Sequence, residues 1–258
     1  MNFNVITSKD NPLIKLVCSL QTSAKARKKE GLFVLEGLRI CDDACENSIR
    51  FDKLIISKTA GEKYAEMLSK FYANADEIYE VPDSLFTKIS DTTSPQGVIA
   101  VVKTPTLSPE ISKNGRYIAL ENLNDPSNLG AISRTAEALG VSGIILSSDS
   151  VDPYSPKSLR ASMGTLLRMP VIILNDFVNE IVETGLKTYA CVVDSDAMPI
   201  SKVDFTDGSI LLIGNEANGL TDSIKAAATQ FITIPMCGKA ESLNAATAAS
   251  ISMWEMMK

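Results

Sequence analysis

The sequence of 258 residues contains no histidine. Histidine is the usual general base near neutral pH, a common metal ligand and the group that activates serine and cysteine nucleophiles. Its absence excludes Ser-His and Cys-His catalysis, so any reaction carried out by this chain runs without imidazole.

Cysteine is sparse and irregularly spaced. An odd number of cysteines without paired spacing gives neither a disulfide framework nor a zinc motif. We therefore expect reduced thiols, a cytoplasmic protein and no bound metal. Cys41 and Cys45 are four residues apart, a spacing that fits one helix face, and small buried apolar side chains are their expected role. The five cysteines are Cys18, Cys41, Cys45, Cys191 and Cys237.

Long apolar runs are also missing. None approaches the roughly 20 residues of a membrane-spanning helix, and the N-terminal residues lack the apolar core of a secretory signal. We expect no membrane partner. Two nucleotide-binding motifs are absent as well. Thr233 stands where a P-loop ending at Lys239 needs glycine, and no Gly-x-Gly-x-x-Gly follows a strand-like run.

Acidic residues outnumber basic ones, and the formal net charge is −6. Residues 1–105 contain 14 basic and 14 acidic residues, whereas residues 106–258 contain 11 and 17. Affinity for a nucleic acid depends on local neutralisation of phosphates rather than on total charge. The basic residues of the N-terminal part are compatible both with nucleic-acid binding and with an ordinary solvated helix end. The candidates for such contacts are Lys25, Arg27, Lys28, Lys29 and Arg39.

A segment rich in proline and serine at 103–116 separates two α/β patterns. It predicts an N-terminal domain over 1–105, a linker over 106–116 and a C-terminal domain over 117–258. Alternating strands and helices in the first part predict a layered α/β domain. Expected strands there are 33–37, 53–57, 77–81 and 97–102, and expected helices are 38–48, 63–71 and 84–89.

Short apolar runs without polar alternation dominate the second part. Such runs indicate strands buried on both faces, and hence a largely parallel sheet. Expected strands are 117–122, 143–148, 171–174, 188–193, 210–215 and 231–235, and expected helices are 129–139, 156–163, 176–184, 221–228 and 243–257.

Three segments at the ends of expected strands combine glycine, asparagine, serine and glutamate. Open α/β sheets bind ligands beyond the carboxyl ends of their strands, so the three segments predict one composite site. They are ENLNDPSNLGAISRTAEALG (121–140), IGNEANGL (213–220) and ITIPMCGKAESLNA (232–245).

The spacing within the first segment predicts a helix that begins near Leu129, with Asn128 as its cap and Gly140 at its end. Arg134 is expected to point away from the core, because it lies about 200° around the helix from the apolar Ile132. There it either overhangs a ligand crevice or is simply solvated.

The other two segments combine loop residues with helix caps. Gly214 allows a ligand to approach the backbone closely, and Glu216 lies in the loop, where it is also compatible with an ordinary surface acid. Thr221 or Asp222 is the expected cap of the next helix. In the third segment Ser242 is the expected cap of the C-terminal helix, with the amide of Asn244 available on its first turn.

Together the three segments resemble the motifs of the SpoU-type RNA ribose 2′-O-methyltransferases of the SPOUT superfamily. Residues 159–171 (LRASMGTLLRMPV) are similar to a further stretch of that family. The N-terminal half is similar to the accessory RNA-binding domain of one branch, through residues 11–15, 33–37, 94–102 and Arg27. The residues that match the three motifs are Asn128, Gly130, Arg134 and Gly140, then Ile213, Gly214, Glu216 and Gly219, then Ile234, Pro235, Met236, Gly238, Ser242, Leu243 and Asn244.

The resemblance implies an α/β fold: a C-terminal trefoil-knotted, mostly parallel sheet flanked by helices, plus a smaller N-terminal α/β sandwich. It also implies S-adenosylmethionine as cofactor, RNA as partner and a homodimer. The implied cofactor contacts are Gly214, Ile234 and Leu243, together with Asn215, Met236 and Gly238. The implied catalytic set is Arg134 with Asn128, Glu216, Ser242 and Asn244.

The implied reaction places a ribose 2′-hydroxyl in line with an electrophilic methyl group. An arginine normally stays protonated, so we expect Arg134 to hold a phosphate and stabilise the developing alkoxide rather than act as a base. Ribosomal RNA is the favoured substrate and transfer RNA the second. Two other readings are a non-catalytic RNA-binding or ribosome-assembly factor and an enzyme that confers drug resistance.

Overall fold

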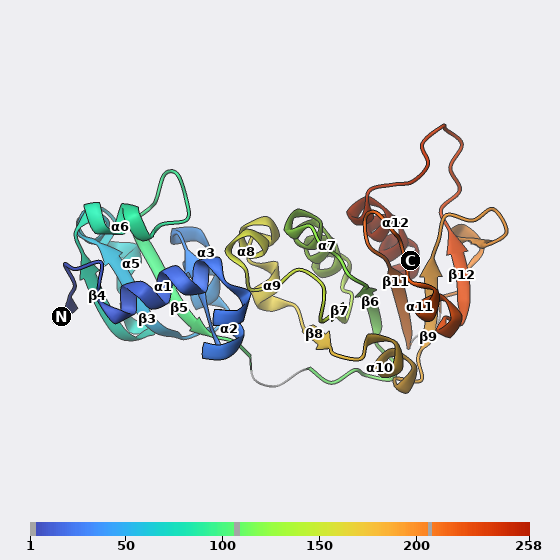
Figure 1. Ribbon diagram of the computed structural model, residues 1–258, viewed down its shortest axis with the longest axis horizontal. Helices are drawn as coiled ribbons and strands as arrows, with labels where there is room; N and C mark the ends of the chain where they lie inside the picture. The colour runs from blue at the N-terminus through green and yellow to red at the C-terminus, as the bar shows by residue number, and fades with distance from the viewer. Residues whose placement is uncertain (1–3, 106–108, 206–207) are drawn as a thin grey trace. The chain divides into compact units, whose positions relative to one another are not determined.

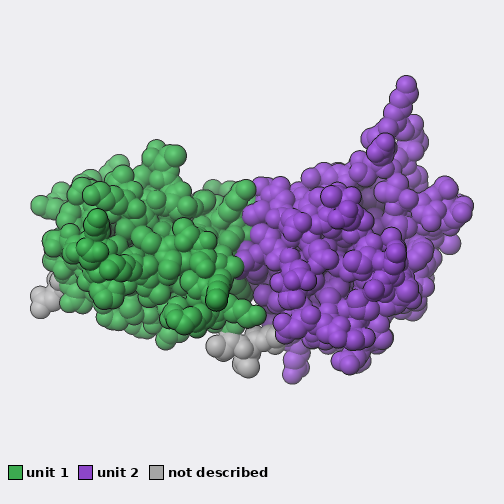
Figure 2. Space-filling view, viewed as in Figure 1, with its two compact units in different colours: residues 1–106, 154–167 green, residues 107–153, 168–258 purple. Residues whose placement is uncertain are grey.

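The computed structural model describes residues 4–105, 109–205 and 208–258. The chain forms two compact units (Figure 2): Met1–Thr106 with Tyr154–Leu167, and Leu107–Pro153 with Arg168–Lys258. The sequence pattern placed Tyr154–Leu167 in the C-terminal domain, whereas its contacts group it with the first unit. The predicted domain boundaries stay a prediction, and residues 106–108 of the predicted linker lie outside the described residues.

The first unit is built on a five-stranded mixed sheet (Figure 1), with strand order β1-β4-β3-β5-β2. Strand β5 runs antiparallel to both β2 and β3, while β4 runs parallel to both β1 and β3. An apolar core that includes Val34, Ile55 and Ile99 packs against one face. The strands are β1 (Asn4–Val5), β2 (Leu32–Glu36), β3 (Phe51–Ser57), β4 (Ala75–Val81) and β5 (Val98–Lys103).

Local capping sets the helix boundaries of the first unit. The Asn11 side chain accepts the N–H of Leu13 at the start of α1, and α2 ends at Gly31 in the left-handed conformation, φ 62°. The single helix expected over 63–71 is two helices, α4 and α5, that meet at Tyr64. The helices are α1 (Pro12–Thr22), α2 (Ala24–Glu30), α3 (Leu38–Glu46), α4 (Lys58–Lys63), α5 (Ala65–Ala73), α6 (Asp83–Ile89) and α8 (Pro156–Ser162).

Helix α8 packs against the edge strand β2 of the first unit. The rings of Phe33 on β2 and Tyr154 lie 5.0 Å apart, and Arg160 on α8 forms an ion pair with Asp91 at 2.7 Å. A covered edge strand does not offer unpaired backbone groups to other chains. These contacts explain why Tyr154–Leu167 belongs to the first unit.

The second unit is built on a seven-stranded sheet in the order β10-β12-β9-β11-β6-β7-β8. All its strand pairs are parallel, which confirms the mostly parallel sheet predicted from the apolar runs. Every residue of the central strand β11 is buried. The strands are β6 (Arg116–Leu120), β7 (Gly143–Ser147), β8 (Val171–Leu174), β9 (Lys187–Cys191), β10 (Met198–Pro199), β11 (Ser209–Ile213) and β12 (Gln230–Thr233).

Two helix starts in the second unit differ from the prediction. Helix α7 begins at Pro126, because the Asp125 side chain accepts the N–H of Ser127 and proline suits the first helical position. Asn128 is therefore inside the helix and is not its cap. Helix α12 begins after Asn244, whose side chain accepts the N–H groups of Ala246 and Thr247, so the expected cap Ser242 is wrong.

The remaining helices agree better with the sequence. Helix α7 ends at Gly140 in the left-handed conformation and α11 is capped by Thr221, both as predicted. Helix α12 packs on α7. The helices of the second unit are α7 (Pro126–Leu139), α10 (Phe177–Glu183), the 3₁₀ turn η1 (Ile200–Lys202), α11 (Asp222–Ala227) and α12 (Ala245–Met257). The short helix α9 (Thr165–Arg168) belongs to the first unit apart from Arg168.

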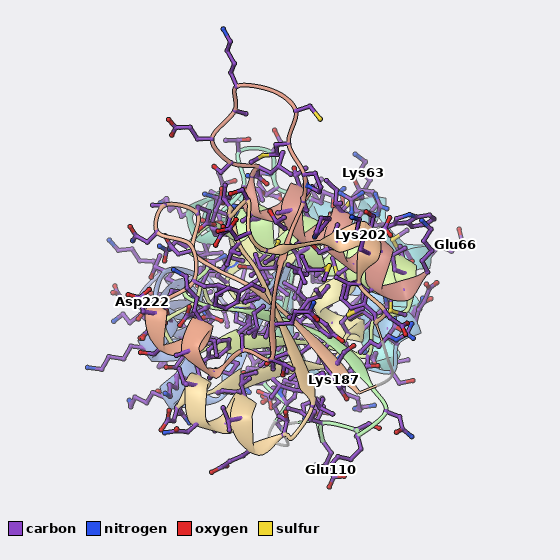
Figure 3. All side chains as sticks on the ribbon, turned by 90° about the vertical axis from the view of Figure 1, so that its right-hand side faces the viewer. Lys63, Glu66, Glu110, Lys187, Lys202 and Asp222 are labelled. Atoms are coloured by element: carbon purple, nitrogen blue, oxygen red, sulfur yellow. The ribbon has the colours of Figure 1, made fainter. Side chains whose placement is uncertain are left out.

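Parallel strands place four loops at one edge of the second sheet. They follow the carboxyl ends of β6, β9, β11 and β12, and the loop between β12 and α12 stands out from the body of the unit (Figure 1). Charged side chains such as Lys187, Lys202 and Asp222 point outward (Figure 3). Among the described residues, no helix has the length and apolar character needed to cross a lipid bilayer.

Candidate active site

Three of the predicted site residues form one hydrogen-bonded chain. The Nδ2 of Asn128 on α7 donates to Glu216 Oε1 at 2.8 Å, and the Nδ2 of Asn244 donates to Asn128 Oδ1 at 3.0 Å. Asn128 is only 7% exposed, so both halves of its amide are satisfied within the protein, as a buried amide requires. The three predicted segments therefore meet in space.

The Glu216 carboxylate also fastens the start of α7. It accepts the backbone N–H of Asn124 at 3.2 Å and of Asp125 at 3.1 Å. Partial burial acts to raise the pKa of Glu216, but the hydrogen bonds from Asn128 and from backbone N–H groups outweigh it and hold the pKa below its usual value. Glu216 is therefore ionised near neutral pH and is used as an acceptor.

The loop between β11 and α11 is a closed turn. Asn215 exchanges two backbone hydrogen bonds with Gly219, at 3.0 and 2.9 Å, and its side chain donates to the carbonyl of Asn122 at 2.7 Å. A Cβ on Gly214 would lie 2.1 Å from the carbonyl carbon of Gly219. Only glycine fits at 214, because the obstacle is backbone rather than a movable side chain.

Glu121 belongs to the same assembly, and sequence reasoning missed its role. This buried carboxylate at the end of β6 accepts the backbone N–H and the hydroxyl of Thr221, at 2.8 and 2.6 Å. It fixes the start of α11 and thus the end of the 214–220 loop. An acidic residue immediately after an apolar strand was the available signal.

The loop over 214–220, the loop between β12 and α12 and the residues that follow β9 line a cavity of about 430 Å³ in the second unit. Of the predicted cofactor contacts, Gly214, Asn215, Ile234, Met236 and Leu243 line it, and Gly238 does not. Of the predicted catalytic residues, Glu216 and Ser242 line it.

The cavity wall also contains residues that the prediction omitted. They come from the end of β9 and the loop after it, and from β12 and α11, and include Cys191, Val193, Asp194, Lys225 and Phe231. The run TYACVV was recognised as a strand, so the rule that ligands bind beyond the carboxyl ends of parallel strands would have found the first three.

The residues that line the cavity suit S-adenosylmethionine. The volume falls within the usual range for small-molecule sites, and the wall combines apolar side chains, including Ile213, Leu220 and Phe231, with a few polar groups. Gly214 lines the cavity without a side chain of its own. A purine ring and a thioether chain need apolar walls, and their polar edges need backbone partners of this kind.

Arg134 occupies an exposed position on α7, as predicted, and does not line the cavity. It has no hydrogen-bonding or ion-pair partner among residues 4–105, 109–205 and 208–258. Its guanidinium is therefore available to an anionic ligand.

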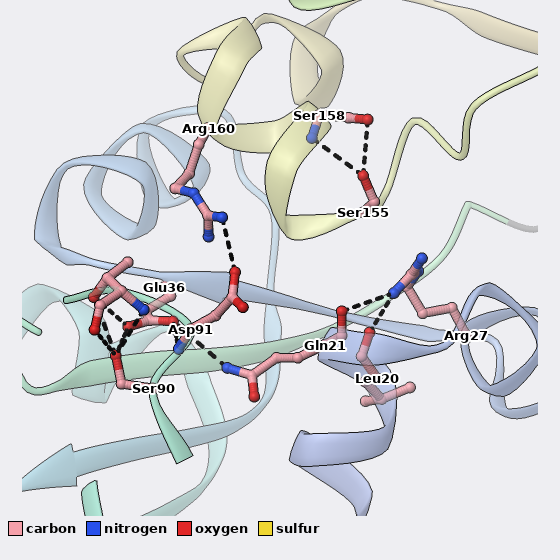
Figure 4. Close-up of polar contacts among 10 residues, drawn as sticks. Leu20, Gln21, Arg27, Glu36, Ser90, Asp91, Ser155, Ser158 and Arg160 are labelled. Carbon is pink, nitrogen blue, oxygen red and sulfur yellow. Dashed lines mark hydrogen bonds and ion pairs between the residues drawn. The ribbon is translucent and has the colours of Figure 1, made fainter. Parts of the chain in front are cut away.

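The predicted RNA-contacting residues do not share one environment. Lys25, Lys28 and Lys29 are exposed on α2, and Arg39 is exposed on α3. Arg27 is only 6% exposed, and its Nη1 donates to the carbonyls of Leu20 and Gln21 at 2.5 and 3.4 Å (Figure 4). The structure corrects the role expected for Arg27, because it joins α2 to α1 instead of facing solvent.

A second polar network orders the first unit (Figure 4). The Glu36 carboxylate accepts hydrogen bonds from Ser90, from Thr92 Oγ1 at 2.8 Å and from the backbone N–H of Asp91 at 2.9 Å. The Asp91 carboxylate in turn pairs with Arg160.

Within the described ranges, no group of three or more His, Cys, Asp or Glu side chains is placed to hold a metal ion.

Comparison with known proteins agrees with this geometry. Residues 115–254 match the model of the SpoU rRNA Methylase family, and residues 11–100 match an MRM3-like substrate binding domain. An uncharacterized tRNA/rRNA methyltransferase of Synechocystis is 32% identical over 254 residues, which cover 97% of this chain and 92% of the relative. The 23S rRNA (guanosine(2553)-2′-O)-methyltransferase RlmP of Bacillus subtilis is 25% identical and covers 97% and 98%.

The crystal structure of an AdoMet-bound rRNA methyltransferase from Sinorhizobium meliloti has the same fold, with a TM-score of 0.85. It is 28% identical, and the match covers 98% of this chain and 97% of that one. The hydrogen-bonded loops, the cavity and the two matched domains lead to one assignment: the chain belongs to the SpoU rRNA methylase family.

Proposed function

We propose that this chain is an S-adenosylmethionine-dependent methyltransferase that modifies a ribose 2′-hydroxyl in ribosomal RNA. The observation that carries the proposal is the hydrogen-bonded chain Asn244–Asn128–Glu216, which ties three loops together beside a cavity of about 430 Å³. The name of the Bacillus relative supports both the ribose position and the ribosomal substrate.

The cofactor when bound supplies an electrophilic methyl group, so the protein needs mainly to position the two reactants. In this proposal the cofactor is held by Gly214, Asn215, Ile234, Met236 and Leu243. Gly238 contributes to cofactor binding indirectly, as part of the loop between β12 and α12. Because Glu216 is fully engaged by N–H donors, its role is to hold the loops in place. Asn128 and Asn244 share that role.

Arg134 is the proposed catalytic cation. Its exposed guanidinium has no partner among the described residues, and it can hold a phosphate through a bidentate hydrogen bond. The same charge stabilises the negative charge that develops on the 2′-oxygen. Ser242, exposed in the loop between β12 and α12, supplies a hydroxyl to the substrate side of the cavity.

The first unit is proposed to bind the RNA, as its match to a substrate binding domain suggests. Lys25, Lys28, Lys29 and Arg39 are its exposed candidates. Transfer RNA is the second candidate substrate, because the Synechocystis relative is named for both RNAs. A homodimer and a trefoil knot, both implied by the resemblance, are part of the proposal. Trp254, which is 57% exposed on α12, is an apolar group that a second copy would cover.

Two measurements test the proposal. Calorimetry of the purified protein should detect binding of S-adenosylmethionine. Mapping of ribose methylation in ribosomal and transfer RNA, from cells with and without the gene, should reveal one site in ribosomal RNA that depends on the gene. Identical methylation maps from the two kinds of cells, together with no cofactor binding, would refute the proposed enzymatic function. If the methylation site that depends on the gene lay in transfer RNA instead, the assigned substrate would be transfer RNA.

A further inference from the structure

The cavity wall contains three charged side chains: Asp194, Glu216 and Lys225. Lys225 pairs with Asp222 on the same helix at 3.3 Å. The Glu216 carboxylate stays ionised, and its oxygens accept three N–H groups. Asp194 is thus the second carboxylate of the wall, and it has fewer hydrogen-bond partners than Glu216.

Asp194 lies in the loop that follows β9. Its Oδ1 accepts the backbone N–H of Asp196 at 2.8 Å, which holds the side chain in a tight turn. No other hydrogen bond or ion pair connects this carboxylate to the described part of the chain. One carboxylate oxygen is thus held in place, while the other has no hydrogen-bond partner among the described residues.

The cofactor and its demethylated product differ in charge. S-adenosylmethionine has a permanently positive sulfonium group, whereas S-adenosylhomocysteine has a neutral thioether and the same amino-acid and nucleoside groups. A carboxylate in the cavity wall attracts the first ligand more strongly than the second, and discrimination between ligands is a difference of this kind.

On the basis of the proposed function, we propose that Asp194 is a cofactor-binding residue that selects the sulfonium form over the demethylated product. The selection favours exchange of spent cofactor for fresh cofactor after each methyl transfer. Because Asp194 is exposed to solvent, screening limits the preference, and we expect it to contribute about fivefold to the affinity ratio.

Calorimetric titration of three ligands tests the proposal. The wild-type protein, Asp194→Asn and the control Asp196→Asn are each titrated with S-adenosylmethionine, S-adenosylhomocysteine and sinefungin, in which a protonated amine replaces the sulfonium. Asp196 is a neighbouring exposed acid that does not line the cavity. Thermal unfolding of each variant checks that the fold is retained.

In Asp194→Asn, affinity for the two cationic ligands should fall about fivefold, with S-adenosylhomocysteine unchanged. The wild-type preference should also weaken as salt is raised, and Asp196→Asn should behave as wild type. Equal losses for all three ligands would overturn the proposal, because they would place Asp194 against a group that the ligands share. No loss would overturn it too. If the wild-type protein bound none of the ligands, the proposal that S-adenosylmethionine is the cofactor would itself be refuted.

Discussion

Asn128 and Asn244 are 116 positions apart in the sequence, yet the amide nitrogen of Asn244 donates to the amide oxygen of Asn128 at 3.0 Å. Asn244 simultaneously caps α12 through its own amide oxygen. The start of the C-terminal helix is thereby fixed to the first turns of α7, and Glu216 extends the connection to a third loop.

Replacement of Asn128 should separate these loops. Asn128→Ala leaves Asn244 Nδ2 without this partner and removes one of the two hydrogen bonds to Glu216 Oε1, and we expect a loss of about 1–3 kcal/mol in the free energy of unfolding. Affinity for S-adenosylmethionine should fall as well, since the loops line its proposed cavity. Urea unfolding and calorimetry measure the two effects. Ser127→Ala is the control, because the exposed Ser127 contributes only its backbone N–H. Equal behaviour of both variants would contradict the role of Asn128.

Two glycines of the predicted motifs should respond differently to alanine. Gly214→Ala brings a Cβ within 2.1 Å of backbone, so the 214–220 loop must shift and cofactor affinity should fall at least tenfold, which corresponds to about 1.4 kcal/mol. Gly238→Ala meets no atom within 4 Å and should bind the cofactor as wild type does. Calorimetry compares them, and equal affinities would show that the close approach at Gly214 does not shape the cavity.

The low pKa of Glu216 gives a pH dependence with a definite sign. A carboxylate whose pKa is lower in the folded state stabilises the protein above its unfolded pKa, near 4.5, and this contribution is lost as the pH falls through the folded value. The difference in unfolding free energy between wild type and Glu216→Gln should be constant from pH 5 to 7 and shrink below about pH 4.5. Urea unfolding at several pH values measures it. A difference that grew on acidification would reverse the assignment.

Arg134 should affect the reaction more than cofactor binding or stability. Because its side chain has no partner in the described part of the protein, Arg134→Ala should keep the melting temperature and the affinity for S-adenosylmethionine. The methylation rate should fall about 10²- to 10³-fold, typical for removal of one charge-stabilising group. Arg134→Lys should recover only part of the rate, because lysine lacks the bidentate fork. A fully active Arg134→Ala would rule out the proposed role.

The basic residues of the first unit should divide into two classes. Combined replacement of Lys25, Lys28 and Arg39 by glutamine should weaken RNA binding and lower the slope of log affinity against log salt by about 2–3, as expected for three lost phosphate contacts. Cofactor affinity should not change. Arg27→Gln should instead destabilise the fold, because the buried guanidinium holds the carbonyls of Leu20 and Gln21. Filter binding and thermal unfolding separate the two effects, and unchanged RNA affinity in the triple variant would contradict the first.

Features set by local sequence were predicted well. The apolar runs gave the parallel strands of the second unit, Gly140 ended α7, and Thr221 capped α11. Capping choices between neighbouring polar residues were harder. Asp125 and Asn128 can both cap a helix, and so can Ser242 and Asn244. Asp125 caps α7, and Asn128 inside the helix bonds to Glu216 and Asn244. Asn244 rather than Ser242 caps α12, and its amide nitrogen bonds to Asn128.

By itself the sequence determined the α/β alternation, the parallel sheet and the loops that carry the family motifs, because these depend on periodicity and on residues close together in the chain. Only the tertiary structure decided that Asn128 joins Glu216 to Asn244, that Glu121 holds Thr221 and that Arg27 is buried. Each of these depends on which distant group satisfies a polar atom once the chain has packed, and local pattern contains no information about that partner.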